Sequence, residues 1–214
     1  IRRLALVTRR FWPLVGGAEM LMSQLATSFR ERGACPTIVT AQWQPDWPTD
    51  LVHQETPVVR LPNPSHRFWG TMRYMIALAR WIRRQQRAFD LVYVSMLKHD
   101  AYAVLGARAE RRLPVVVRAE GSGETGDCHW QRTARFGERI RRRCLTADAI
   151  VAPSQAIYDE LLAEGYPANL VRHIPNGVAT RPARDAERRL AARQLLADSN
   201  PDLATRAETP VVVF

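Results

Sequence analysis

Short apolar runs alternate along the chain with longer segments in which apolar residues recur every three to five positions. Strands are predicted at residues 4–8, 37–40, 58–61, 91–95, 114–118, 149–152 and 171–174. Helices are predicted at residues 17–32, 68–89, 100–112, 130–145, 155–164 and 186–196. Because strands that alternate with helices of this length pair in parallel through right-handed crossovers, we expect an α/β fold with a doubly wound, Rossmann-like parallel sheet.

The character of the chain changes after Asn176 and Gly177. The following residues are polar and rich in Arg and Ala, and residues 211–214 form one last apolar run. We therefore expect residues 1–178 to be one domain. Residues 179–214 are expected to be an interdomain linker and the first strand of a second domain, so that the chain is part of a longer protein.

The charge of the chain favours an anionic partner. Lys and Arg number 31 against 21 Asp and Glu, which leaves a formal net charge of +10. Lipid head groups, phosphorylated substrates and nucleic acid all fit such an excess, and an Arg-rich proteome is the alternative explanation. No helix-turn-helix, RNA-binding or zinc motif accompanies the charge, so nucleic acid is not an expected partner.

Cysteine usage indicates a reducing compartment. The three cysteines are odd in number and scattered, without the spacing of a disulfide framework or a metal site. No run approaches the roughly 18 apolar residues of a membrane span. The cytoplasm is the expected location.

Gly121, Gly123 and Gly126 have the spacing G-x-G-x-x-G, which is also the spacing of the dinucleotide fingerprint. That fingerprint belongs between the first strand and the first helix, whereas these glycines follow a late strand. The acid that should end the next strand, Asp148, begins one instead. The loop also carries acidic side chains, a poor lining for a pyrophosphate: Glu120, Glu124 and Asp127. The sequence therefore argues against NAD binding.

Gly16 and Gly17 stand between the first strand and the first helix. Without a Cβ at these positions a ligand can approach the backbone closely, and the helix N-terminus offers free N–H groups. A diphosphate or a sugar hydroxyl would suit this turn. The alternative is that the two glycines only make the turn tight.

Two segments resemble the retaining GT-B glycosyltransferases of family 4. The first, FWPLVGGAEMLMSQLATSFRERGACPTIVTA, is similar to the opening of that family. The second, ADAIVAPSQAIYDELLAEGYPANLVRHIPNGV, is similar to its later strand–helix–strand segment. The resemblance covers nearly the whole chain and implies one half of a two-domain GT-B enzyme, the N-terminal domain that mainly binds the acceptor.

The resemblance implies transfer of a hexosyl group from a nucleotide diphosphate-sugar to an acceptor hydroxyl, with retention of anomeric configuration. Gly16 and Gly17 match glycines that approach the donor diphosphate and the acceptor, and Asn176 and Gly177 match the crossing between domains. The donor nucleotide is held largely by the other domain, so this chain alone is expected to be inactive. The nucleotide-sugar is a co-substrate, and no cofactor or metal is expected. The alternative is a non-catalytic module of the same fold that binds a glycan or an anionic surface.

Many family members place a His after the strand that corresponds to residues 114–118, and this chain has Glu120 there. Glu120 or Asp127 could orient or deprotonate an acceptor hydroxyl. A salt bridge between Glu120 and Arg118 is the alternative. Lys98 and His99 follow another strand. Together with Arg118, they are further candidate contacts of the donor or the acceptor.

Asp100, beside that pair, is expected to be the N-cap of the next helix.

The helix predicted at residues 68–89 has two neighbouring faces. A core-like face is expected to hold Phe68, Met72, Met75, Ala79 and Ile82. The second face holds Trp69 together with Arg73, Arg80, Arg84 and Arg87. Such a surface suits anionic lipid, with a solvated face as the alternative.

Family members that act on lipid-linked acceptors often bind membranes through basic helices of this domain. The acceptor is therefore expected to be a saccharide or a lipid-linked one, and the resemblance adds a peripheral location at the inner face of the membrane. A second basic run would extend the surface: Arg132, Arg135, Arg139, Arg141, Arg142 and Arg143.

Overall fold

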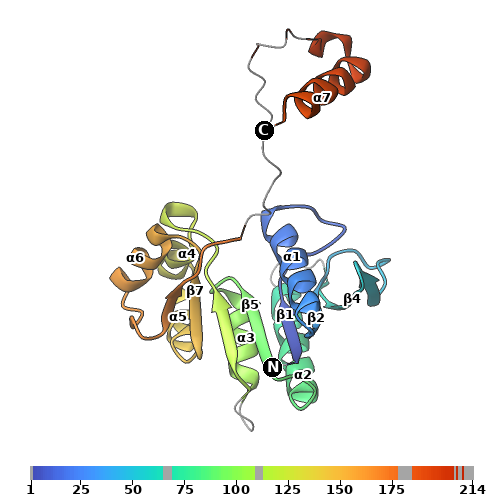
Figure 1. Cartoon of the computed structure of the whole chain (residues 1–214). Coiled ribbons are helices and arrows are strands. Elements are labelled where there is room, and N and C mark those ends of the chain that lie inside the picture. Colours follow the sequence, from blue (N-terminus) through green and yellow to red (C-terminus); the bar gives the residue numbers. More distant parts are fainter. Residues whose placement is uncertain are drawn as a thin grey trace. The chain divides into compact units, whose positions relative to one another are not determined.

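The computed structural model describes residues 2–64, 69–108, 113–177, 185–204, 206 and 209. Its described strands form one eight-stranded sheet in the order β3-β4-β2-β1-β5-β6-β7-β8. The strands are β1 (Arg3–Val7), β2 (Cys35–Gln42), β3 (Asp50–His53), β4 (Thr56–Pro62), β5 (Leu91–Ser95), β6 (Val115–Arg118), β7 (Ala149–Ala152) and β8 (Val171–His173). Neighbours are parallel, except that β3 is antiparallel to β4. The predicted doubly wound, Rossmann-like sheet is confirmed (Figure 1).

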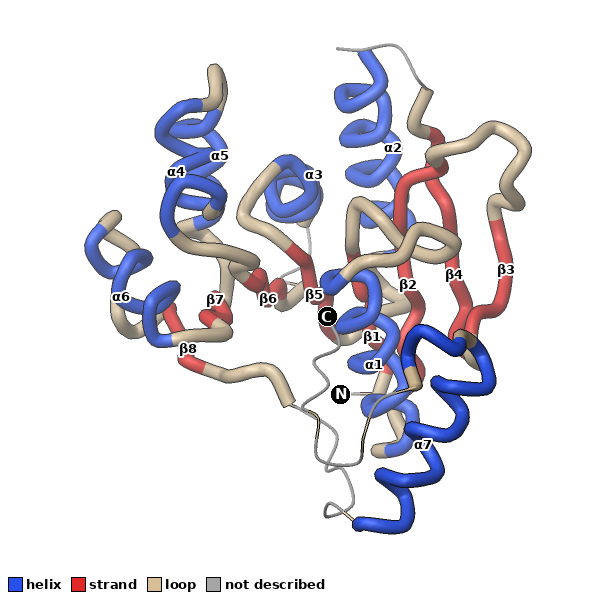
Figure 2. Tube along the Cα trace, turned by 90° about the horizontal axis from the view of Figure 1, so that it is seen from above, coloured by secondary structure: helices blue, strands red, loops and turns tan. Residues whose placement is uncertain are grey.

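Helices cover the central strands on both faces. They are α1 (Gly17–Glu31), α2 (Trp69–Gln85), α3 (His99–Ala107), α4 (Asp127–Thr133), α5 (Gly137–Cys144), α6 (Gln155–Ala163) and α7 (Ala186–Ser199). In Figure 2, α1 lies on one face of the sheet and α2, α3, α4 and α5 lie on the other. Leu6 and Met22 belong to the apolar cluster on the α1 side, and Val94 and Leu78 to the opposite cluster. Burial on both faces explains why β1 is an unbroken apolar run rather than an alternating one.

The hairpin of β3 and β4 corrects the sequence prediction, which had no strand at residues 50–53. The two residues that connect these strands, Gln54 and Glu55, both have positive φ, at 45° and 59°. A two-residue hairpin needs this geometry, and it is usually signalled by Asn-Gly or Asp-Gly. Because neither residue is Gly or Asn, the usual sequence signal of a hairpin is missing.

The helix predicted at residues 130–145 is wrong as a single element, because α4 ends at Thr133 and α5 begins at Gly137. A Cβ on Gly137 would lie 1.9 Å from the carbonyl oxygen of Gln131. The start of α5 therefore packs directly against the backbone of α4, which only Gly allows. Apolar spacing continues across the break and does not reveal it.

The buried face of α2 matches the predicted one only in part: Ile82 is buried, and Met75 and Ala79 pack against the core. Its buried residues are Gly70, Tyr74, Leu78 and Ile82. Met72, which was expected in the core, is 41% exposed, and Phe68 lies outside the described residues. Tyr74 can be buried because its hydroxyl donates a 3.3 Å hydrogen bond to Asp100 Oδ2, so that its polar end is satisfied.

The chain divides into two compact units, Ile1–Pro175 and Asn176–Phe214. The first contains the whole sheet, and the second contains α7, at the place where a helix was predicted. The strand predicted at residues 211–214 lies outside the described residues, as does the end of the helix predicted at 100–112. The assignment of residues 179–214 to a linker and a second domain stays a prediction. Among the described helices, none combines the length and apolar character needed to cross a bilayer.

Candidate active site

The candidate site lies at the carboxyl edge of the sheet, where β1, β5 and β6 end. This edge is uppermost in Figure 1 and faces the viewer in Figure 2. Parallel α/β sheets bind ligands at this edge. The loops that carry the candidate residues lie here: residues 8–16, 96–98 and 119–126. Polar contacts join them into one site.

Glu120 connects the ends of β5 and β6. Its Oε1 accepts a 2.7 Å hydrogen bond from the hydroxyl of Ser95 and forms an ion pair with Nη1 of Arg118. The salt bridge considered as an alternative for Glu120 is therefore present. The Glu120 side chain remains 19% exposed while that of Arg118 is 6% exposed, so the carboxylate is fixed in position and still reaches the surface.

Asp127 is the first residue of α4 and is buried, with 2% of its side chain exposed. Its Oδ2 accepts a 2.7 Å hydrogen bond from the backbone N–H of Glu120. The ammonium of Lys98 lies 3.8 Å from Oδ1. Burial raises the pKa of Asp127, while the hydrogen bond from Glu120 and the charge of Lys98 oppose that rise. This geometry suits a residue that positions Glu120, and no observation tests a catalytic role for Asp127.

Lys98 and His99 begin α3 at the same edge. Lys98 is the N-cap residue and is partly exposed. The imidazole of His99 packs edge-on against Trp130, with ring centroids 5.0 Å apart. Burial lowers the pKa of His99, and the charges of Arg9 and Lys98 lower it further. His99 is therefore neutral at pH 7, a state in which it can both donate and accept hydrogen bonds.

Asp100 is not the N-cap that was predicted. It lies within the first turn of α3 and is 5% exposed. Its Oδ1 is 3.8 Å from Nη1 of Arg9, and its Oδ2 accepts from Tyr74. Burial raises the pKa of Asp100 to about 6, against the opposing effects of Arg9 and Tyr74. A cation from another loop, rather than helix capping, is the partner of this carboxylate.

Arg9 is the residue that the sequence interpretation missed. Its Nη2 donates to Asn63 Oδ1 at 3.0 Å and to Thr71 Oγ1 at 3.3 Å. Its guanidinium lies 4.1 Å from the ring centroid of Tyr74. Arg9 is the second residue after β1, so the rule that selected Lys98 and Glu120, position just after a strand, could have selected it too. The many other arginines of the chain concealed this one.

A cavity of about 200 Å³ opens between these loops. Its lining residues are Arg9, Thr71, Ser95, Met96, Lys98, His99 and Asp100. Met96 has a φ of 71°, in the left-handed region that side chains other than Asn, Asp and Gly rarely adopt. Such strain often accompanies functional sites, and here it occurs in the loop that lines the cavity.

The Gly16–Gly17 turn begins α1 at the same edge. A Cβ on Gly16 would lie 2.5 Å from Oε2 of Glu19, whereas nothing lies within 4 Å of one on Gly17. Glu19 also lies 3.4 Å from Nε of Arg10. The open side of the turn is therefore at Gly17, where a ligand can reach the backbone. The proposed donor and acceptor contacts of this turn stay predictions.

The G-x-G-x-x-G loop is closed on itself. Gly123 has a φ of +67°, and a Cβ on Gly126 would lie 2.8 Å from the carbonyl oxygen of Gly121. The glycines serve this tight turn, which brings Asp127 back to Glu120. The loop contains a short 3₁₀ turn, Gly123–Thr125, and follows β6. A dinucleotide fingerprint would instead lie between β1 and α1.

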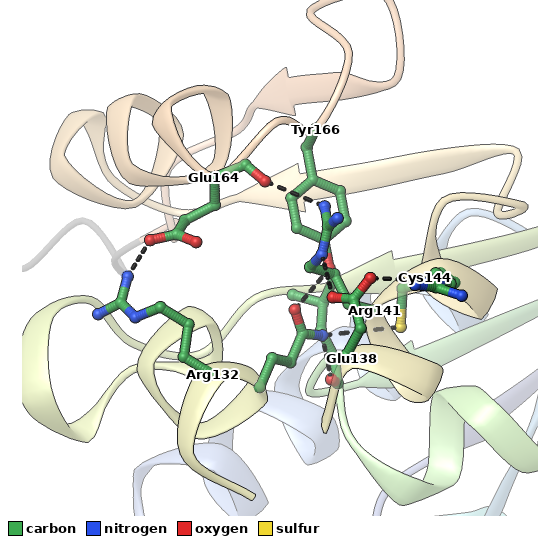
Figure 3. Close-up of polar contacts among 9 residues, drawn as sticks. Arg132, Glu138, Arg141, Cys144, Glu164 and Tyr166 are labelled. Carbon is green, nitrogen blue, oxygen red and sulfur yellow. Dashed lines mark hydrogen bonds and ion pairs between the residues drawn. The ribbon is translucent and has the colours of Figure 1, made fainter. Parts of the chain in front are cut away.

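The helix that carries Asp127, α4, is held in place by buried hydrogen bonds of Gln131. The side chain of Gln131 donates a 2.7 Å hydrogen bond to the carbonyl of Leu97, next to Lys98. The hydroxyl of Tyr166 donates to Gln131 Oε1 at 2.8 Å. Figure 3 shows Tyr166 beside an ion-pair network that joins α4, α5 and the end of α6. The hydrogen bond from Gln131 therefore fixes the position of α4 relative to the loop after β5.

Asn176 and Gly177 follow β8 in the sequence and belong to the second unit. Their assignment to the crossing between domains stays a prediction.

The chain matches the sequence profile described as Glycosyltransferase Family 4 over residues 15–182. No curated protein matches the chain in sequence. Sucrose-phosphate synthase from Thermosynechococcus elongatus is similar in structure, with a TM-score of 0.66 and 16% identity over 89% of this chain and 53% of that one. HepE of Anabaena, solved with UDP and glucose, has a TM-score of 0.62 and 18% identity over 94% and 51%. A third similar structure, the lipopolysaccharide outer core galactosyltransferase WaaB, has a TM-score of 0.58 and 15% identity over 86% and 50%.

At these identities the solved structures establish the fold alone, and this chain spans about half the length of each of them. The family match covers most of the chain and includes the Gly16–Gly17 turn and the loops at residues 96–98 and 119–126, while Arg9 lies before it. The chain belongs to glycosyltransferase family 4.

Proposed function

We propose that this chain is the acceptor-side domain of a retaining glycosyltransferase that moves a hexosyl group from a nucleotide diphosphate-sugar to an acceptor hydroxyl. The observation that supports the proposal best is the position of Glu120. Its carboxylate is held by Arg118 and Ser95 at the carboxyl edge, and Ser95 also lines the cavity.

Glu120 acts on the acceptor in this proposal. During transfer the acceptor oxygen bonds to the anomeric carbon, the bond from that carbon to the diphosphate breaks, and the acceptor hydroxyl loses its proton. A fixed carboxylate orients the hydroxyl through a hydrogen bond and can accept the proton. Asp127 positions Glu120 through the backbone N–H.

The leaving diphosphate needs positive charge as the sugar–oxygen bond breaks. Gly16 and Gly17 offer it backbone N–H groups at the start of α1. The described residues of the edge also include the carboxylates of Glu120, Asp100 and Asp127. We therefore place most of the donor-binding charge in the remaining half of the protein and expect no metal or cofactor in this half.

The identity of the donor can be determined by direct assay. The HepE structures hold UDP with glucose or UDP-glucose, so a UDP-sugar is the first donor to test. Full-length protein is incubated with UDP-, ADP- and GDP-hexoses and a panel of glycan acceptors, and the product anomer is identified by NMR. The proposal predicts one consumed donor and a product with the donor's anomeric configuration. An inverted product contradicts retention, and glycan binding without transfer supports the non-catalytic module.

We further propose that α2 binds the anionic inner face of the membrane. Its exposed apolar side chains are Trp69 at 69%, Met72 at 41% and Ile76 at 41%. Its basic residues Arg73, Arg80 and Arg84 are exposed, as is Arg87 beyond its end, and α2 contains no acidic residue. Aromatic and apolar groups beside arginines are the composition of interfacial helices.

The basic run on α4 and α5 contributes less to this surface than the sequence suggested, because much of it is paired with acids. Arg132 pairs with Glu164, and both Arg141 and Arg142 pair with Glu138.

A further inference from the structure

The cavity between α2, α3 and the loop after β1 contains two cations that come from different loops. Arg9 reaches it from the end of β1, and Lys98 from the end of β5. The single carboxylate among its lining residues is Asp100. The remaining titratable lining residue, His99, is neutral at pH 7 because its pKa is lowered. The lining therefore has a net positive charge.

Arg9 is oriented by its neighbours and retains hydrogen-bonding capacity. Asn63 and Thr71 accept bonds from Nη2, and Tyr74 lies against the guanidinium. Nη1 is buried and has no hydrogen-bond partner among the described residues, since Asp100 is 3.8 Å away. A buried donor in this state is costly, and a ligand oxygen in the cavity would relieve that cost.

The ammonium of Lys98 also retains hydrogen-bonding capacity. Its ammonium is 3.8 Å from Asp127 and 5.7 Å from the ring centroid of Trp130, and it is 27% exposed. Both distances exceed that of a hydrogen bond, so the ammonium has donors left for a ligand. A volume of about 200 Å³ accommodates a charged group and part of one sugar ring rather than a whole oligosaccharide.

We infer that this cavity binds a phosphate group of the acceptor substrate, with Arg9 and Lys98 as its two cationic contacts. A dianionic group matches two cations on opposite loops, and Arg is suited to phosphate oxygens through its paired donors. The identification of the ligand as the acceptor rests on the proposed function, whereas the phosphate site itself does not. Arg9 and Lys98 are then specificity-determining residues that select phosphorylated acceptors over neutral ones.

The phosphate contact is tested by the binding of inorganic phosphate to full-length protein without donor, measured by calorimetry. We expect Arg9→Gln and Lys98→Gln each to weaken binding at least about tenfold, as loss of a charge-assisted hydrogen bond implies. Arg142→Gln removes the same charge from an exposed position on α5 and is expected to leave binding unchanged. Absence of phosphate binding, or binding that survives both cavity substitutions, overturns the inference.

Two controls separate the outcomes. Arg9 has structural partners, so thermal melting accompanies each variant, and the partly exposed Lys98 provides a substitution that is not expected to unfold the protein. Displacement of phosphate by a soluble sugar phosphate, or by a polyisoprenyl phosphate in neutral nanodiscs, supports the inference and identifies the source of the group. Displacement by neither overturns the assignment to an acceptor. If wild-type full-length protein binds phosphate but transfers no sugar, that result contradicts the proposed function and leaves the phosphate site standing.

Discussion

The hydroxyl of Ser95 donates a 2.7 Å hydrogen bond to Oε1 of Glu120, and this contact joins the last residue of β5 to the loop after β6. Both residues lie at the edge where a parallel sheet places ligands. Asp127 then holds the backbone of Glu120, and Gln131, on the same helix, holds the loop after β5. Any shift of α4 would therefore change both loops of the candidate site.

Substitution of Gln131 is predicted to destabilise the protein. Gln131 is 3% exposed and satisfies both the Leu97 carbonyl and the Tyr166 hydroxyl. Gln131→Leu leaves these groups without partners, which costs about 1–3 kcal/mol. Urea unfolding measures the change. Gln155→Leu removes an exposed bond to Asp159 and is expected to change stability by less than about 0.5 kcal/mol; equal losses in the two variants would contradict the buried role of Gln131.

Asp100 is predicted to make the protein more stable at mildly acidic pH than at pH 7. Its pKa of about 6 in the folded state exceeds its ordinary value of 3.8. The folded state therefore binds the proton more tightly, and the contribution of this group to stability rises as pH falls through 6 and levels off below about 4. The full contribution is about 3 kcal/mol.

The measurement is the difference in unfolding free energy between pH 4.5 and pH 7, in wild type and in Asp100→Asn. Asp90 and Glu138 have lowered pKa values and act with the opposite sign, but they are present in both proteins and cancel in the comparison. Asp100→Asn should lack the acid-side gain. An identical pH dependence in both proteins would show that the carboxyl group is not perturbed.

The sheet and the location of the site could be predicted from sequence, while its inner contacts could not. Apolar runs located seven of the eight strands, because strands buried on both faces are apolar throughout. β3 was missed because Gln54 and Glu55 form its turn without Gly or Asn. Arg9 and Asp100 were missed as a pair because they lie far apart in the chain, and only the parallel order of β1 and β5 brings their loops together.

Binding of α2 to anionic membranes is predicted to depend on its arginines. Each Arg near a membrane surface contributes about 1 kcal/mol, so Arg80→Gln with Arg84→Gln should weaken binding to phosphatidylserine vesicles about thirtyfold. Vesicle co-sedimentation measures the partition. Arg135→Gln with Arg139→Gln removes equal charge from α5 and the turn before it. If this pair weakens binding as much, net charge rather than α2 is responsible.

Residues 1–214 alone are predicted to be catalytically inactive. The cations of the described site have other partners, since Arg118 pairs with Glu120 and both Arg9 and Lys98 lie in the cavity proposed for the acceptor phosphate. Little positive charge is left for a leaving diphosphate. Groups that remain open to water act in a high dielectric, where their stabilisation of charge is weak. Product formation is followed with a radiolabelled donor. Transfer above the rate without enzyme would place the donor-binding chemistry within residues 1–214.

The most direct test of the proposed site is the transfer rate of full-length protein carrying Glu120→Gln. Glu124→Gln is the matched control, because Glu124 is an exposed acid in the same loop. A positioned acid–base group typically contributes at least about a hundredfold, so Glu120→Gln should lower kcat by about that factor while Glu124→Gln leaves it within about twofold. Equal kcat values in wild type and Glu120→Gln would contradict the assignment of acceptor chemistry to this edge.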